Sequence, residues 1–128
     1  MTEKKLSDFL PDKNTSYFKE FKKINNQIKI TEDEIKVQIQ TVMDPEIPVN
    51  LYDLGLIYLI KVDNLNNISI EMTLTNPNCP VAGSMPESVG LAIEKIPNIQ
   101  SIKVSLVWYP KWNKNMMSED AKLALDIF

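Results

Sequence analysis

The sequence contains no histidine and no arginine, and all 14 of its basic residues are lysines. A histidine-based catalytic triad, a histidine metal site and the guanidinium fork that binds phosphate all need side chains that this chain lacks. The formal net charge of −3 also argues against a nucleic-acid-binding module, which usually carries a basic face. Many common enzyme classes and most nucleic-acid-binding folds are therefore disfavoured.

Cysteine occurs once, at position 79. A single thiol cannot form an intramolecular disulfide, so a secreted, disulfide-stapled fold is disfavoured and a reducing compartment is favoured. No apolar run approaches the roughly 18 residues of a membrane span, and the N-terminus lacks the apolar core of a signal peptide. We therefore predict a cytoplasmic protein that binds neither nucleic acid nor membrane.

The 128 residues suffice for one ordinary hydrophobic core. Residues 1–30 carry seven lysines and four acidic residues, whereas residues 31–128 carry seven lysines and thirteen acidic residues. We therefore divide the chain into a basic N-terminal arm, residues 1–30, and a domain, residues 31–128. Apolar residues between Tyr17 and Ile28 recur at a loosely helical spacing, so the arm forms either an amphipathic helix on the domain or a solvated tail.

The domain begins with a helix signal. Thr31 followed by Glu34 is a capping box, in which each side chain satisfies a backbone N–H of the other residue. Pro45 disfavours helical geometry at the residue before it, so the helix is predicted to end near Met43.

Strand and helix patterns then alternate along the chain. The predicted elements are strands over 56–62 and 68–74 joined as a hairpin, a helix over 84–96, a strand over 102–106 and a short helix after Glu119. The hairpin has one apolar face and one polar face, which predicts a sheet that is buried on one side and wetter on the other. The order helix, strand, strand, helix, strand indicates an α+β two-layer domain with a mixed sheet.

Cys79 lies between Pro77 and Pro80, in a polar bend between the second predicted strand and the second predicted helix. A thiolate near a helix N-terminus is stabilised by unpaired N–H groups and the helix dipole, which lower the pKa of the thiol. A buried, inert cysteine is the simpler interpretation. Because no histidine can serve as its base, a thiol enzyme is the weakest alternative. One thiolate also falls short of the roughly four that an iron–sulfur cluster takes, so any cluster would be bound transiently.

Two further segments carry candidate residues. Asp44, Glu46 and Asp53 are carboxylates in a stiff loop, where either Asp44 ends the helix region and Asp53 makes a turn, or the carboxylates are functional. The tail after residue 106 places large apolar residues around Pro110, either to cap an open end of the core or to form a partner-binding surface. The candidate partner-binding residues are Trp108, Trp112, Met116 and Met117.

Four runs of sequence stand out together: VMDPEIPVNLYDLGLIY (42–58), MTLTNPNCPVAG (72–83), VWYPKW (107–112) and MMSEDAKL (116–123). In this order they resemble the SufT-type iron–sulfur cluster assembly proteins, whose relatives include PaaD-like proteins and small eukaryotic cluster-targeting subunits. Between the two tryptophans this family usually has Asp-Pro-Pro, whereas this chain has Tyr109, Pro110 and Lys111. The resemblance implies a compact α+β domain that assists the assembly or maturation of iron–sulfur proteins.

The resemblance also implies roles for single residues. Cys79 would be a transient ligand of iron or of a cluster, with Asp44 and Glu46 as neighbours and with Thr75 and Pro80 shaping its loop. The protein would act as a carrier or adaptor, not as an enzyme, and would hold no cofactor stably. The implied partners are iron–sulfur assembly proteins and client apo-proteins, and a homodimer is one way to share a cluster. The alternative is an accessory protein-binding module that holds no iron.

Overall fold

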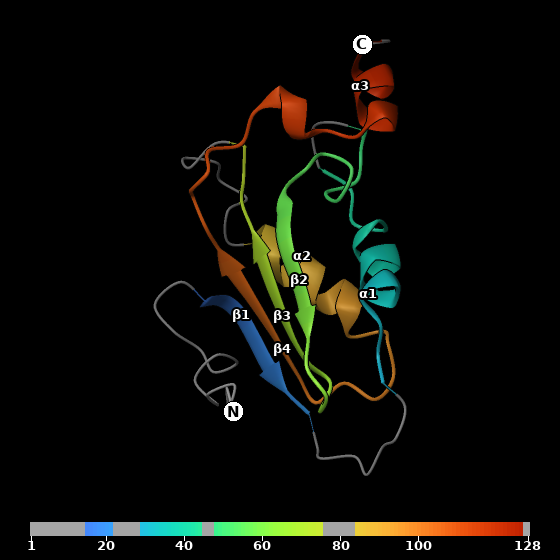
Figure 1. The fold of residues 1–128 in the computed structure, drawn as a ribbon, viewed down its shortest axis with the longest axis vertical. Coiled ribbons are helices and arrows are strands. Elements are labelled where there is room, and N and C mark those ends of the chain that lie inside the picture. Colours follow the sequence, from blue (N-terminus) through green and yellow to red (C-terminus); the bar gives the residue numbers. More distant parts are fainter. Residues whose placement is uncertain (1–14, 22–28, 45–47, 76–83, 127–128) are drawn as a thin grey trace.

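The computed structural model describes residues 15–21, 29–44, 48–75 and 84–126 (Figure 1). Its elements are strand β1 (Thr15–Glu20), helix α1 (Glu32–Ile39), strands β2 (Ile57–Val62) and β3 (Asn67–Met72), helix α2 (Ser84–Ile93), strand β4 (Ser101–Leu106), the 3-10 helix η2 (Lys114–Met116) and helix α3 (Glu119–Asp126). The predicted α+β fold is therefore confirmed. Within the described ranges, no helix has the length and apolar character needed to cross a bilayer.

The four strands form one mixed sheet in the order β1-β4-β3-β2. Strands β2 and β3 form the predicted antiparallel hairpin, and β4 runs parallel to β3. A parallel pair needs a long crossover connection, and helix α2 provides it here. Strand β1 pairs antiparallel with the outer edge of β4.

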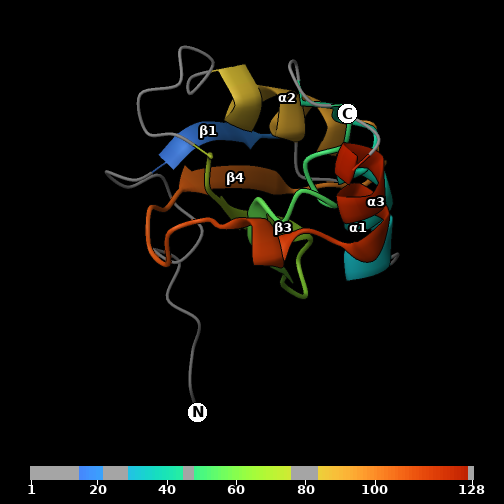
Figure 2. The same ribbon diagram turned by 90° about the horizontal axis from the view of Figure 1, so that it is seen from above.

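Helices α1 and α2 cover one face of the sheet. Helix α2 packs on β4 and β1, while α1 packs on β2 and on α2 (Figure 2). The core lies between these layers and includes fully buried aliphatic side chains from both: Ile35 and Ile39 of α1, Val89 and Ile93 of α2, Ile68 and Ile70 of β3, and Ile102 and Val104 of β4. Burial of each such side chain contributes about 1.5–3 kcal/mol, which makes this layer the main source of stability.

The face of the sheet away from the helices is less wet than predicted. Ser69 of β3 is 8% exposed and Thr73, just after β3, is 1% exposed. On β4, Ser101, Lys103 and Ser105 are also buried. Because β3 and β4 are the central strands, their polar side chains are shielded by neighbours on both sides. The alternation of the hairpin was predicted correctly, and the second face is more covered than expected at Ser69 and Thr73, although Glu71 on the same face is only half-buried.

The N-terminal arm departs most from the prediction. The alternative of an amphipathic helix is wrong for Thr15–Glu20, which form β1. The loosely helical spacing was misleading because Tyr17 and Lys19 face α2, whereas Phe18 between them faces the other side of the sheet. As a strand, Thr15–Glu20 pairs its backbone with the outer edge of β4, whereas a helix docked on the domain would leave that edge unpaired. Residues 1–14 and 22–28 of the arm lie outside the described residues.

Helix α1 starts as predicted and ends early. The Thr31 hydroxyl accepts a hydrogen bond from the Glu34 N–H at 3.2 Å, as its capping role requires. The predicted end near Met43 is wrong, since the helix ends at Ile39. Beyond Ile39 the chain bonds to a later segment and does not continue the helix: the Leu51 N–H donates to the Val42 carbonyl at 2.9 Å.

Candidate functional site

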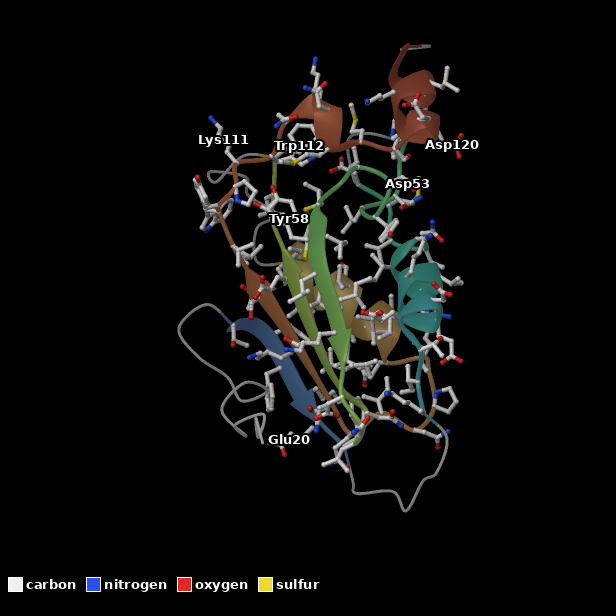
Figure 3. The ribbon with its side chains drawn as sticks, in the orientation of Figure 1. Glu20, Asp53, Tyr58, Lys111, Trp112 and Asp120 are labelled. Atoms are coloured by element: carbon white, nitrogen blue, oxygen red, sulfur yellow. The ribbon has the colours of Figure 1, made fainter. Side chains whose placement is uncertain are left out.

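Three segments that carry candidate residues meet at one end of the sheet. The parallel strands β3 and β4 have their carboxyl ends at the same edge, where the Val107 N–H donates to the Met72 carbonyl at 2.8 Å. On the other side of β3, the Thr73 N–H donates to the Leu56 carbonyl at 2.8 Å. Figure 3 shows Trp112, Tyr58 and Asp53 at this end, far from Glu20 at the opposite end. We call this end, formed by residues 50–58, 72–75 and 107–118, the motif end of the sheet.

A tight turn over residues 50–55 forms one wall of the motif end. The Asn50 side-chain amide donates to the Asp53 carboxylate at 2.8 Å, and the Asn50 side-chain oxygen accepts from the Asp53 N–H at 2.9 Å. Gly55 follows with φ of +82°, a left-handed conformation that side chains rarely adopt. The turn thus aims the chain into β2 and leaves the Leu54 carbonyl available to the tail.

The tail after β4 is fastened to this turn by directional contacts. The Trp112 indole N–H donates to the Leu54 carbonyl at 2.7 Å. The Ser118 N–H donates to the Asp53 carbonyl at 2.8 Å. Each of these contacts joins residues more than fifty positions apart in the sequence, so the tail is an integral part of the motif end.

Tyr58 forms a third fastening. Its hydroxyl donates to the Pro110 carbonyl at 2.7 Å, and its oxygen lies 3.5 Å from the Met116 sulfur. Burial raises the pKa of Tyr58 above the ordinary value of 10.0, so the phenol stays protonated and remains a donor near neutral pH. The tail is therefore held at three points between Pro110 and Ser118.

Between the turn and the tail lies an open cleft of about 590 Å³. Its described lining consists of Tyr52, Asp53, Gly55, Ile57, Tyr58, Pro110, Met116 and Ser118. A cleft of this size accepts a small ligand or a few side chains of a partner. Its aromatic and methionine walls suit the second role, since such residues are enriched at interfaces.

The tail residues predicted as a group occupy two different environments. Met117 is 8% exposed and Trp112 packs on the core, so these two cap an open end of it. Trp108 is 44% exposed and Tyr109 is 90% exposed. Met116 is half-buried in the cleft wall. Trp108 and Tyr109 are therefore the exposed aromatic pair of the tail, and partner binding by Trp108, Trp112, Met116 and Met117 stays a prediction.

Of the five predicted loop residues, the structure describes Asp44 and Thr75. Asp44 is half-buried, and its N–H donates to the Val49 carbonyl at 3.1 Å. Thr75 is exposed at the bend that follows β3. Glu46, Cys79 and Pro80 lie outside the described residues, so their roles and the proximity of Asp44 to the thiol stay predictions. Within the described part of the chain, no three His, Cys, Asp or Glu side chains are grouped so as to hold a metal ion.

The sequence reasoning missed two residues of the motif end. Tyr109 is absent from the predicted partner-binding residues, although an aromatic residue between Trp108 and Pro110 is a signal for an exposed hydrophobic pair. Tyr58 is predicted only as a strand residue, and its bond to the Pro110 carbonyl depends on a tail position that no local pattern reveals.

The chain matches proteins of known families and known structure. A family model described as "Iron-sulfur cluster assembly protein" matches residues 27–106. The chain is 46% identical over 102 residues to a Porphyromonas gingivalis protein named "Fe-S protein maturation auxiliary factor", covering 80% of this chain and 97% of the relative. It is 40% identical to the Staphylococcus aureus "Fe-S protein maturation auxiliary factor SufT", covering 67% of this chain and 98% of the relative. A Bacillus anthracis crystal structure of a domain of unknown function superposes with a TM-score of 0.73 at 38% identity, covering 76% of this chain and 92% of that one.

Proposed function

Because this chain belongs to the iron–sulfur cluster assembly protein family, we propose that it assists the maturation of iron–sulfur proteins as a non-catalytic carrier or adaptor. The cluster, or its iron, is cargo in this proposal and not a resident cofactor. We further propose that the protein works in the cytoplasm, with iron–sulfur assembly proteins and client apo-proteins as its partners.

The observation that carries this proposal is the meeting of three motif segments at one end of the sheet. Thr75, which opens the segment leading to Cys79, follows β3, and Trp108 follows the parallel strand β4. The turn over residues 50–55 is fastened to the tail beside them. The chain leaves β3 through Thr75 at the same end of the sheet as the exposed aromatic pair after β4, which supports a site where a client docks close to the cargo.

The chemistry proposed for the cargo uses few ligands. Cys79 supplies a thiolate, and Asp44 and Glu46 are proposed as neighbouring carboxylates. A stable cluster takes about four thiolates, so one thiolate leaves most positions of the cargo open to ligands from the client. A cargo held by so few ligands is stored poorly but is transferred easily to a client protein, which suits an auxiliary factor.

Anaerobic reconstitution tests the carrier role. The full chain is incubated with ferrous iron and sulfide, desalted, and examined for the visible charge-transfer absorbance of protein-bound iron and sulfide. We expect wild-type protein to become coloured and Cys79→Ser to remain colourless with an unchanged circular dichroism spectrum. Thr75→Ser, a conservative change in the same loop that leaves the thiol in place, is the matched control and should retain the colour. A colourless wild-type protein would overturn the carrier role and leave the adaptor role.

The exposed aromatic pair favours the second candidate, an adaptor that binds partners without holding iron. Trp108→Ala should reduce the capture of iron–sulfur assembly proteins while lowering the free energy of unfolding by only about 1 kcal/mol, since the residue is 44% exposed. Trp112→Ala is the matched comparison, because its indole bonds the Leu54 carbonyl and packs on the core. It should cost about 2–3 kcal/mol of stability. Unchanged partner capture by Trp108→Ala contradicts docking at this pair.

A further inference from the structure

Strand β1 lies outside the part of the chain that the family model matches. The family model begins at residue 27, so β1 (Thr15–Glu20) lies outside it, whereas α2 and β4 lie inside it. Without β1, the outer edge of β4 would present unpaired backbone N–H and carbonyl groups. The register runs from Thr15 opposite Ser105 to Glu20 opposite Ser101, so β1 covers almost the whole length of that edge.

Helix α2 forms a notch beside this edge that fits one aromatic ring. A Cβ atom at Gly90 would lie 2.2 Å from Cε1 of Tyr17, so the ring occupies space that any larger residue would fill. At the far end of the ring, the Tyr17 hydroxyl donates to the Glu94 carboxylate at 3.2 Å. The notch therefore combines a glycine floor with a carboxylate at its end.

The same carboxylate selects a cation two residues further along the strand. Lys19 forms an ion pair with Glu94, whose side chain is only 19% exposed. Glu87, two turns earlier on α2, adds a second negative charge that acts on the Tyr17 phenol. The groove thus carries negative charge, and Lys19 is the residue of β1 that pairs with it. An extended segment with the pattern aromatic-X-Lys would pair with the β4 edge, place its ring in the Gly90 notch and place its lysine beside the Glu94 carboxylate.

We propose that the outer edge of β4, with Gly90 of α2 and Glu94 just after α2 beside it, is a strand-binding groove for an extended aromatic-X-Lys segment of a partner protein, and that β1 occupies it in cis as a competitor. Backbone pairing with β4 supplies affinity and the notch supplies specificity, as in other strand-addition modes of recognition. This groove goes beyond the proposed function and is independent of Cys79 and of iron.

Because β1 of the same chain occupies the groove, it lowers the apparent affinity of a partner segment for the groove. A segment tethered by a short linker acts at an effective concentration in the millimolar range, so β1 outcompetes weak ligands. The apparent dissociation constant of a partner segment rises in inverse proportion to the fraction of open groove. Weakening the cis contacts should therefore raise partner affinity without any change in the groove itself.

The test uses the full chain and a fluorescent synthetic peptide with the sequence of residues 13–22. Tyr17→Ala combined with Lys19→Ala releases the cis strand and leaves Gly90 and Glu94 intact. By fluorescence anisotropy, we expect the peptide to bind this variant on the order of tenfold or more tightly than it binds wild type. Hydrogen exchange should show new protection of the β4 amides, residues 101–106, when the peptide is added.

Two controls keep the result specific. Adding Gly90→Ala to the released variant fills the notch and should abolish peptide binding, although alanine favours the helix itself. Should that variant fail to fold, Glu94→Gln removes the negative charge at constant size and should weaken binding at least fivefold. Equal binding to wild type and to the released variant, or binding that survives both controls, would overturn the proposal. Because no iron or sulfide is present, this outcome is separate from that of the reconstitution experiment.

Discussion

Gly55 is the residue at which the turn and the tail of the motif end come closest. Its φ of +82° lies in a region where a side chain costs about 1–3 kcal/mol. A Cβ atom here would also lie 2.3 Å from the Met116 carbonyl oxygen, so the tail would have to move. We expect Gly55→Ala to lower the free energy of unfolding by about 2–4 kcal/mol, measured by urea unfolding followed by circular dichroism.

Gly55→Asn separates the two causes of that loss. Asparagine adopts the left-handed conformation more readily than alanine, but it carries the same Cβ atom. If the contact with Met116 dominates, the two variants should lose similar stability; if backbone strain dominates, the asparagine variant should recover part of it. An unchanged urea midpoint for Gly55→Ala contradicts docking of the tail on this turn.

At the scale of one element, strand β1 is coupled to pH through Tyr17. Burial, and then the negative charge of Glu94, raise the pKa of Tyr17 above its ordinary value of 10.0. The folded state thus binds the phenol proton more tightly than the unfolded chain does. Below about pH 10 both states are protonated and the stabilisation is fully present. As the pH rises from there through the folded pKa, the unfolded chain loses its proton first and stability falls.

We therefore expect the free energy of unfolding to decline above pH 10 more steeply in wild type than in Tyr17→Phe, which has no phenol to titrate at this position. Urea unfolding at several pH values from 8 upward measures both slopes. The pKa of Tyr58 is also raised by burial, so Tyr58→Phe should remove a separate part of the same decline. Parallel curves for wild type and Tyr17→Phe contradict the placement of the Tyr17 phenol beside Glu94.

The elements predicted well from sequence are those whose pattern is local. The hairpin follows from strict alternation, as Ile68, Ile70 and Met72 are all fully buried, and the start of α1 follows from the Thr31 cap. The elements predicted poorly depend on distant partners. Strand β1 exists because β4 has an open edge, and α1 ends early because Val42 pairs with Leu51, which are facts of tertiary structure.

At the scale of the whole molecule, the motif end shows which part of a site sequence reasoning reaches. Residue types and spacing identified Cys79, Asp44 and the tail aromatics as candidates. Their assembly depends on the parallel pairing of β3 with β4, which brings Thr73 and Val107 to one edge, and the element order alone does not fix that pairing. Within the tail, Trp112 packs on the core and bonds to the Leu54 carbonyl, whereas Tyr109 is exposed, and both placements depend on residues far away in the sequence.

The division of the chain into an arm and a domain leads to a last prediction. Every described residue of the buried core cluster lies at or after Ile30, whose N–H also donates to the Asn66 side chain at 3.0 Å. Of the described arm residues, Ile30 belongs to that cluster, whereas Tyr17 and Phe21 pack against it while only partly buried. A chain that begins at Lys29 should therefore fold, with a free energy of unfolding about 2–4 kcal/mol below that of the full chain.

The shortened chain should also differ in how it associates. Loss of β1 leaves the outer edge of β4 unpaired, and an open edge favours pairing with other chains. We expect analytical ultracentrifugation to show concentration-dependent association of the shortened chain, reversed by the peptide of residues 13–22, since the peptide restores the covered edge. A shortened chain that is unfolded would mean that β1 is indispensable to the fold and that the boundary near residue 30 is wrong. A folded chain that stays monomeric would mean that the β4 edge does not accept another copy, and the groove would then depend on the chemistry of Gly90 and Glu94 for its selectivity.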